Sequence, residues 1–190
     1  MDAQLFIGIA TLLTSVGTIA AVIVALKAVN VAKKSFVADH LRRKQQATIE
    51  YYNELSNNIT VPLRNEISVA LGETHYQISY TPIMPDSQIW KENRDLQIKV
   101  VKYCRNMERF AVGIKLGVFD FDTFYYIAGQ STAELFEQIH NLVNNTIITN
   151  RHKAQFCTEY VNLCEKLIKR YHTESSEDKI SKNSLNNLTK

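Results

Sequence analysis

The hydrophobic pattern of the chain opens with a long uncharged stretch. Residues 3–26, AQLFIGIATLLTSVGTIAAVIVAL, contain no Asp, Glu, Lys or Arg. A helix rises about 1.5 Å per residue, so about 22 such residues measure roughly 33 Å and can cross a bilayer core of about 30 Å. The pattern therefore predicts a transmembrane helix over residues 4–26.

The flanks of this stretch predict its orientation. The N-terminal flank offers only Asp2, whereas residues 27–44 hold a single acid, Asp39, and six cations: Lys27, Lys33, Lys34, Arg42, Arg43 and Lys44. Under the positive-inside rule we expect residues 1–3 outside and the rest of the chain in the cytoplasm, with a single pass through a bacterial inner membrane. A cleaved signal peptide is the alternative, but it requires a basic start and a shorter apolar stretch.

Beyond the span, the pattern is helical throughout. No glycine or proline lies between Gly17 and Pro62, which predicts a basic stalk helix over residues 27–58, continuous with the span. We expect Pro62 to restart the chain in a short helix that ends at Gly72. Residues 73–85 predict a loop, with a brief strand-like alternation around Tyr76, Ile78 and Tyr80.

The remaining helices are predicted from apolar spacing and capping residues. Asp86 or Ser87 begins a helix to Leu116, Asp120 begins a short one over 121–129, and Ser131 with Glu134 forms a capping box for a helix to Asn150. Two seams with four- and three-residue spacing mark core-facing sides. They consist of Leu96, Val100, Tyr103, Met107, Phe110 and Ile114, and, in a last helix over 153–172, of Cys157, Val161, Cys164, Ile168 and Tyr171.

The predicted fold is therefore all-α. A transmembrane helix continues into a cytoplasmic stalk and is followed by a small helical bundle over residues 59–172. A polar tail over 173–190 lacks aromatic residues and is expected to be disordered.

Charge and cysteine content sharpen this picture. The net charge of +3 divides into +5 over residues 27–44, −1 at Asp2 and −1 over the rest. The basicity is thus local, and it suits either a topology signal beside anionic lipid or a ligand-binding patch. Cys104, Cys157 and Cys164 form no CxxC pair, so we expect buried thiols in a reducing compartment, with no zinc site.

Motifs for catalysis are missing from the sequence. It has no GxSxG, HExxH or GxxxxGK[ST], and its histidines stand singly on separate segments. We therefore expect no enzyme activity, no catalytic residue, no metal site and no cofactor. An enzyme whose site residues are distant in sequence is a weaker alternative.

The span carries two patterned faces. Gly8, Thr11, Ser15 and Thr18 share one face, and the small residues Gly17, Ala21 and Ala25 share another, which Ala32 continues. Small residues let membrane helices approach, and hydroxyls can bond across an interface. We expect a homo-oligomer, with a tetramer favoured, whose hydroxyl face meets its copies or a narrow lumen. In the other interpretation these hydroxyls bond back to their own helix.

Two cytoplasmic patches are candidates for anion binding. One is Arg42, Arg43 and Lys44; the other is a row on the third cytoplasmic helix, consisting of Lys91, Arg94, Lys102, Arg105 and Arg109. Arginine on a rigid helix, with Tyr103 and Tyr51 or Tyr52 for stacking, suits phosphate or single-stranded nucleic acid. The alternative is a solvated face paired with the interleaved Glu92, Asp95 and Glu108.

A short segment carries a family resemblance. ERFAVGIKLGVFD, residues 108–120, resembles the E-x-x-A-x-G-I-x-x-G-x-x-D core of a domain-of-unknown-function family of small bacterial membrane-anchored helical proteins. Its matching positions are Glu108, Ala111, Gly113, Ile114, Gly117 and Asp120. The family's basic element followed by Thr is similar to Arg42, Arg43 and Thr48.

The layout also resembles the membrane effectors of Hailong-type anti-phage systems. That resemblance implies a nucleotidyltransferase encoded nearby, whose oligonucleotide product controls an oligomeric membrane channel. The function expected from the sequence is thus an oligomeric, pore-forming membrane effector in antiviral defence, controlled by a nucleic-acid ligand. The alternative is a passive anchor in the lipid bilayer that recruits a cytoplasmic partner.

Overall fold

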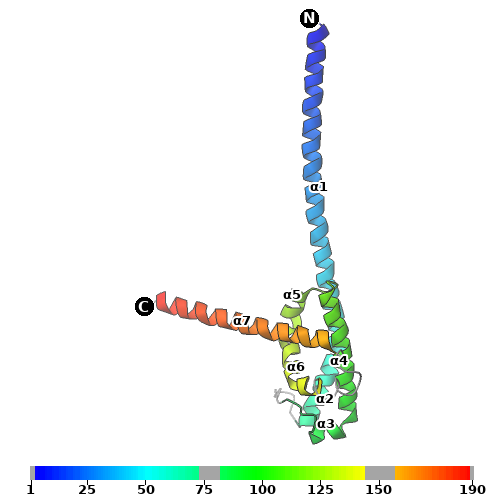
Figure 1. Cartoon of the computed structure of the whole chain (residues 1–190), viewed down its shortest axis with the longest axis vertical. Coiled ribbons are helices and arrows are strands. Elements are labelled where there is room, and N and C mark those ends of the chain that lie inside the picture. The colour runs from blue at the N-terminus through cyan, green and yellow to red at the C-terminus, as the bar shows by residue number, and fades with distance from the viewer. Residues whose placement is uncertain (1–2, 73–81, 144–156, 189–190) are drawn as a thin grey trace. The chain divides into compact units, whose positions relative to one another are not determined.

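The described part of the protein is entirely helical. The computed structural model describes residues 3–72, 82–143 and 157–188, and every regular element in these ranges is an α-helix or a π-helical turn (Figure 1). This confirms the all-α prediction for those ranges, whereas the alternation around Tyr76, Ile78 and Tyr80 lies outside the described residues. The chain forms two compact units, Met1–Arg43 and Lys44–Lys190.

The first unit is helix α1 (Ala3–Leu55) up to Arg43. Side chains from Val16 to Arg43 are all exposed. By length and composition, the helix that holds this segment can cross a membrane, and none of its apolar window is buried. An apolar helix without protein neighbours is what a lipid-facing segment requires. The structure thus confirms a candidate span near the N-terminus.

The second unit begins on α1 itself. Thr48, Tyr52 and Leu55 are buried at four- and three-residue spacing, which is why the boundary falls at Lys44 and not at the expected residue 58. A π-helical turn, η1 (Ser56–Thr60), leads into α2 (Val61–Leu71). Pro62 lies in the first turn of α2 and does not restart the chain, because Thr60 keeps helical angles, φ −68° and ψ −49°. Gly72 ends α2 as predicted, in the left-handed region at φ 69°.

The helix expected from residue 86 to Leu116 is in fact two helices. Ser87 caps α3 (Gln88–Glu92), as predicted. At Asn93 the backbone leaves the helix, with φ −98° and ψ 88°, and the Asn93 side chain accepts a hydrogen bond of 2.9 Å from the Leu96 amide. Asn93 is thus the N-cap of α4 (Arg94–Lys115). The single-helix prediction was wrong because an asparagine cap interrupts the pattern without disturbing its apolar period.

The capping box at Ser131 and Glu134 was also wrong. Asp120 caps α5 (Phe121–Phe124) as predicted, but a π-helical turn, η2 (Tyr125–Gly129), carries the helical backbone straight into α6 (Gln130–Leu142). Ser131 is already inside the helix, where its hydroxyl donates to the Ala128 carbonyl over 3.1 Å. The expected end at Asn150 lies outside the described residues.

Helix α7 (Thr158–Leu188) follows Cys157, which has φ 70°. Its expected start at Lys153 lies outside the described residues. The helix continues past His172 to Leu188, and this differs from the expected disordered tail over 173–190. The segment from Thr158 to Leu188 contains neither glycine nor proline, so nothing in it breaks the helical backbone.

The core lies where α4 packs against α7 and α2. The predicted α4 seam is buried from Leu96 to Phe110, and Ile114 packs at its edge. All three cysteines are free and buried, as predicted. Burial raises the pKa of Cys164 above its ordinary value, so this thiol stays protonated. Aromatic rings fill much of the remaining space, with Phe110 and Phe124 edge to face at 4.8 Å.

One buried polar contact joins α1 to the turn before α5. The Thr48 hydroxyl is fully buried; it donates to the Lys44 carbonyl over 2.8 Å and accepts from the Asp120 amide over 2.7 Å. The Asp120 carboxylate accepts two bonds of 2.8 Å from Thr123 and lies 3.7 Å from the Lys44 ammonium. Burial opposes ionisation of Asp120, but these donors outweigh it and lower its pKa.

The end of α4 is shaped by two glycines. Gly117 has φ 76°, a conformation that L side chains rarely adopt, and it turns the chain toward Asp120. Gly113 leaves room for the Phe119 ring, because a Cβ there would lie 2.5 Å from Phe119 Cδ2. That ring in turn lies 4.9 Å from the Tyr51 ring on α1. Both glycines therefore serve the same junction between α1, α4 and α5.

The Thr48 contact predicts the effect of a near-isosteric change. We expect Thr48→Val to lower the free energy of unfolding by about 1–3 kcal/mol, because the buried Asp120 amide loses its acceptor. The measurement is denaturant unfolding of the full chain in detergent, followed by the fluorescence of Trp90, the only tryptophan and a buried one. Thr48→Ser keeps the hydroxyl and is the matched control; equal stability of the Val variant and the wild type would contradict the assignment.

The contact between Gly113 and the Phe119 ring reverses the usual preference for alanine over glycine inside a helix. Alanine normally stabilises a helix interior by about 1 kcal/mol over glycine, yet we expect Gly113→Ala to destabilise the protein by about 1–3 kcal/mol because the Phe119 ring must move. The same unfolding assay measures the change. Adding Phe119→Leu should recover part of the loss, and a Gly113→Ala variant as stable as wild type would show that the contact does not constrain the ring.

Candidate ligand-binding surface

The exposed side of α4 is hollowed along the predicted basic row. A hollow of about 640 Å³, here called the α4 hollow, is lined by Arg94, Gln97, Ile98, Val101, Lys102, Arg105, Asn106 and Arg109. The buried seam fixes which side of α4 faces the core, so the cations at three- and four-residue spacing are left on the opposite side. Four of the five predicted row residues are thus brought together. Lys91 is apart, on α3.

Three cations of the row are not paired with the acids that interleave it. Among the ion pairs of the described residues, none involves Arg94, Lys102 or Arg109. Glu108 instead accepts hydrogen bonds from the amides of Glu159 and Tyr160 at the start of α7, over 3.3 and 2.8 Å. Arg94, Lys102 and Arg109 therefore do not form the ion pairs expected for a solvated face.

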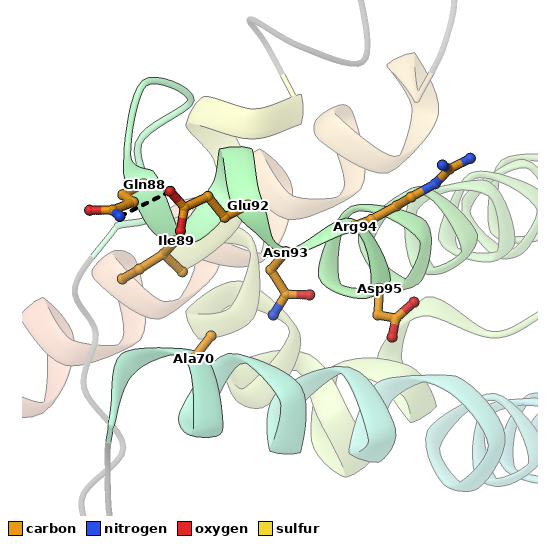
Figure 2. Close-up of a pocket in the computed structure, with 7 residues that line it drawn as sticks. All are labelled: Ala70, Gln88, Ile89, Glu92, Asn93, Arg94 and Asp95. Carbon is orange, nitrogen blue, oxygen red and sulfur yellow. Dashed lines mark hydrogen bonds between the residues drawn. The ribbon is translucent and has the colours of Figure 1, made fainter.

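The other two acids line a second hollow of about 640 Å³, between α2, α3 and α4 (Figure 2). Glu92 accepts a hydrogen bond of 2.9 Å from Gln88, and Asp95 lies on the lining in the first turn of α4. Figure 2 shows the Arg94 side chain extending away from Asn93 and Asp95. This hollow has acidic and amide groups together, which makes it a poorer anion site than the α4 hollow.

A smaller hollow of about 180 Å³ adjoins the row where α4 meets the end of α1. Lys102 and Asn106 line both, and the other residues lining the smaller one are Tyr51, Glu54, Leu55, Asn58 and Ile59. Burial raises the pKa of Tyr51 and nearby Glu54 adds to this, while Arg109 opposes it. The phenol therefore stays neutral, and Glu54 is the only acid that lines either of these two hollows.

The expected stacking platform is not present on the row. Tyr103 is 1% exposed, and its hydroxyl lies 3.3 Å from that of Tyr160. Tyr52 is buried as well, with its ring 5.3 Å from Phe124. The prediction that Tyr103 or Tyr52 serves stacking was wrong, because both belong to the core seams. Tyr51 alone is partly exposed.

The surroundings of the first basic patch are described, and its role as a ligand site stays a prediction. Arg43 belongs to the first unit and pairs with Asp39 over 2.8 Å on the helix surface. Lys44 belongs to the second unit and faces Asp120 at 3.7 Å. Arg42 is exposed. Two of the three cations are thus engaged in pairs, and Lys44 supports the fold.

The predicted oligomer face is described only in part. The side chains of Gly8, Thr11 and Ser15 lie outside the described residues. Thr18 donates to the Thr14 carbonyl over 2.8 Å, so this hydroxyl bonds back to its own helix, as the alternative interpretation has it. Ala21 and Ala25 are exposed, and nothing lies within 4 Å of a Cβ placed on Gly17. The small-residue face is open to a neighbouring helix.

Metal binding finds no support in the described ranges. There, no group of three or more His, Cys, Asp or Glu side chains is placed to hold an ion.

Sequence reasoning missed four residues of the α4 hollow. Gln97, Ile98, Val101 and Asn106 line it between the cations. The same three- and four-residue spacing from Arg94 could have found them, since it marks every residue of that helix side. Ile98 is 56% exposed, so the floor of the hollow is aliphatic between charged ends.

The residues of the predicted family signature hold the fold together. Glu108 caps α7, Gly113 and Gly117 shape the end of α4, and Asp120 with Thr48 ties that end to α1. None of these five residues is part of the lining of the α4 hollow. The signature thus describes a packing junction, and the α4 hollow lies outside it.

Comparison with known proteins agrees with the family resemblance. A family model described as a domain of unknown function (DUF4760) matches residues 15–171, which includes most of α1 and reaches into α7. Neither a curated protein nor a solved structure matches the chain. Because the matched range covers most of the sequence, the chain belongs to the DUF4760 family of domains of unknown function.

Proposed function

We propose that this protein is a membrane effector that α1 anchors in a bacterial inner membrane and that a nucleic-acid ligand on α4 controls. The observation that carries the proposal is the gathering of four cations along one side of α4, three of which form no ion pair within the described residues. Arg94, Lys102 and Arg109 make none of the ion pairs of the described residues, and Glu108 is turned away to cap α7. Charged groups held on a rigid helix, with their counter-charges removed, attract polyanions.

The anchor follows from the first unit. Side chains from Val16 to Arg43 are exposed along an uninterrupted helix, and its apolar window needs lipid or neighbouring helices to cover it. The open small-residue face at Gly17, Ala21 and Ala25 suits self-association of spans, in a tetramer or another ring. The orientation proposed, with residues 27 onward in the cytoplasm, follows from the cations after the span.

The effector role and its place in antiviral defence extend the proposal by analogy. An oligonucleotide made by a partner nucleotidyltransferase would occupy the α4 hollow, and its binding or release would open a pore among the spans. The rival function is a passive anchor that recruits a cytoplasmic protein. The aliphatic floor at Ile98 and Val101 favours this rival, since protein partners bury apolar surface.

Removal of charge from the row tests ligand binding. We expect Lys102/Arg105/Arg109→Gln to weaken the binding of a short single-stranded oligothymidylate at least about tenfold, and to flatten the slope of log affinity against log salt by about 2. The measurement is fluorescence anisotropy with the full chain in detergent, over a series of salt concentrations. The charge-matched control is Lys33/Lys34/Lys169→Gln, at exposed lysines outside the row. Equal losses in both variants would remove the row from the proposal.

Pore formation is tested in the span. We expect the wild type to depolarise cells in one ligand state and Thr11/Ser15/Thr18→Leu to abolish this, because an apolar face offers no polar lumen. A potential-sensitive dye reports the change. Ile9/Ile23/Val24→Leu alters a different side of the same helix and should retain depolarisation. If the wild type never depolarises, or a monomeric foreign span preserves function, the protein is a passive anchor.

A further inference from the structure

The α4 hollow offers charge and aliphatic surface, but no free aromatic ring. Its lining consists of cations, two amides and the side chains of Ile98 and Val101. The two rings nearest in sequence on α4, Tyr103 and Phe110, are 1% and 0% exposed. Proteins that hold the bases of a single strand do so by stacking them on exposed rings. Within the described residues, the row has nothing of this kind.

Among the described residues that line the α4 hollow and the smaller hollow, Tyr51 is the one aromatic ring, and it packs into the core. It stacks on Phe110 with ring centroids 5.5 Å apart and planes 5° apart, and it lies 4.9 Å from Phe119. The ring therefore belongs to the aromatic core at the junction of α1 and α4. It lines the smaller hollow and not the α4 hollow, so it is not placed between the cations of the row as a platform for bases.

The cations are arranged as a single line. Lys102, Arg105 and Arg109 follow one another at three- and four-residue spacing, so each lies about one turn, or roughly 5–6 Å, from the next. Arg94 extends the line to about 22 Å along the helix. One line of charge on a convex helix follows one chain of phosphates. It does not embrace the two strands of a duplex.

From these features we infer that the α4 hollow recognises the repeating phosphates of a single flexible chain and does not read its bases. The inference rests on the proposed function and narrows its ligand class. Single-stranded DNA, a base-free deoxyribose-phosphate chain and inorganic polyphosphate share the required chemistry. All three should compete for the same cations, whichever of them is the source in the cell.

The test compares these three chains on the full protein in detergent. A labelled oligothymidylate is displaced by unlabelled oligothymidylate, by an abasic oligonucleotide of equal length and by polyphosphate. We expect the abasic chain to bind within about threefold of the oligothymidylate, whereas the loss of even one stacked base would cost about fivefold to 150-fold. Both should show a salt slope near −2, as about three phosphate contacts predict.

The outcomes separate this inference from the proposed function. If oligothymidylate binds and the abasic chain is weaker by about fivefold or more, the bases are read and the inference is overturned, while the proposed ligand site stands. If none of the three chains binds, the proposed function itself fails. Displacement by the abasic chain but not by polyphosphate would show that the sugar-phosphate backbone is recognised, and not phosphate charge alone. That result would overturn the inference that any flexible chain of phosphates binds.

The guanidinium planes of the arginines are the remaining flat groups on which a base could lie. A charge-matched variant separates stacking on these planes from attraction by their charge. Arg94/Arg105/Arg109→Lys keeps every positive charge and removes the planes. We expect it to retain the salt slope and the equal binding of both oligonucleotides. If the wild type prefers oligothymidylate and the Lys variant does not, the bases stack on arginine and the inference is wrong.

Discussion

The second unit depends on the buried hydroxyl of Thr48. It accepts from the Asp120 amide over 2.7 Å and donates to the Lys44 carbonyl, so one side chain joins two segments that are far apart in sequence. A buried amide without an acceptor destabilises the fold by about 1–3 kcal/mol. Here the acceptor is a single oxygen, the Thr48 hydroxyl. Asp120 then uses its own side chain to begin α5. The contact thus joins the part of α1 that belongs to the second unit to the start of α5.

The junction also determines what α4 can do. Gly113 and Gly117 let Phe119 fold back against Tyr51 and Phe110. Glu108, one turn earlier, turns inward to the amides of α7. The same arrangement that packs one side of α4 thus withdraws an acid from its other side. Packing and surface charge are therefore coupled, and this explains how a family signature made of structural residues can sit beside a basic surface.

Local patterns predicted much of this fold, because they act over a few residues. The four- and three-residue seam of α4 and the caps at Ser87 and Asp120 needed no knowledge of tertiary contacts. Two other local signals failed. The period of the apolar residues continues past Asn93, so the break there was hidden, and the Ser131 capping box was overridden because η2 carries the helix through it.

The site was predictable in its residues but not in its electrostatics. Spacing alone placed Arg94, Lys102, Arg105 and Arg109 on one side of a helix. Whether neighbouring acids neutralise them depends on partners such as the Tyr160 amide, which lies 52 residues beyond Glu108. Tyr103 has the spacing of the buried seam, opposite the row, and its contact with Tyr160 agrees with that place in the core.

Control by a ligand requires more than an attractive surface. A ligand shifts an equilibrium only if it interacts differently with the two states. Glu54, on the part of α1 that belongs to the second unit, lines the smaller hollow together with Lys102 of the row. A phosphate chain on Lys102 would therefore lie beside a carboxylate of like charge, and repulsion would favour arrangements in which this end of α1 moves away from α4. Thr48 lies about two helical turns before Glu54 on α1 and is bonded to Asp120. The Thr48–Asp120 hydrogen bond would therefore oppose the movement that the repulsion favours.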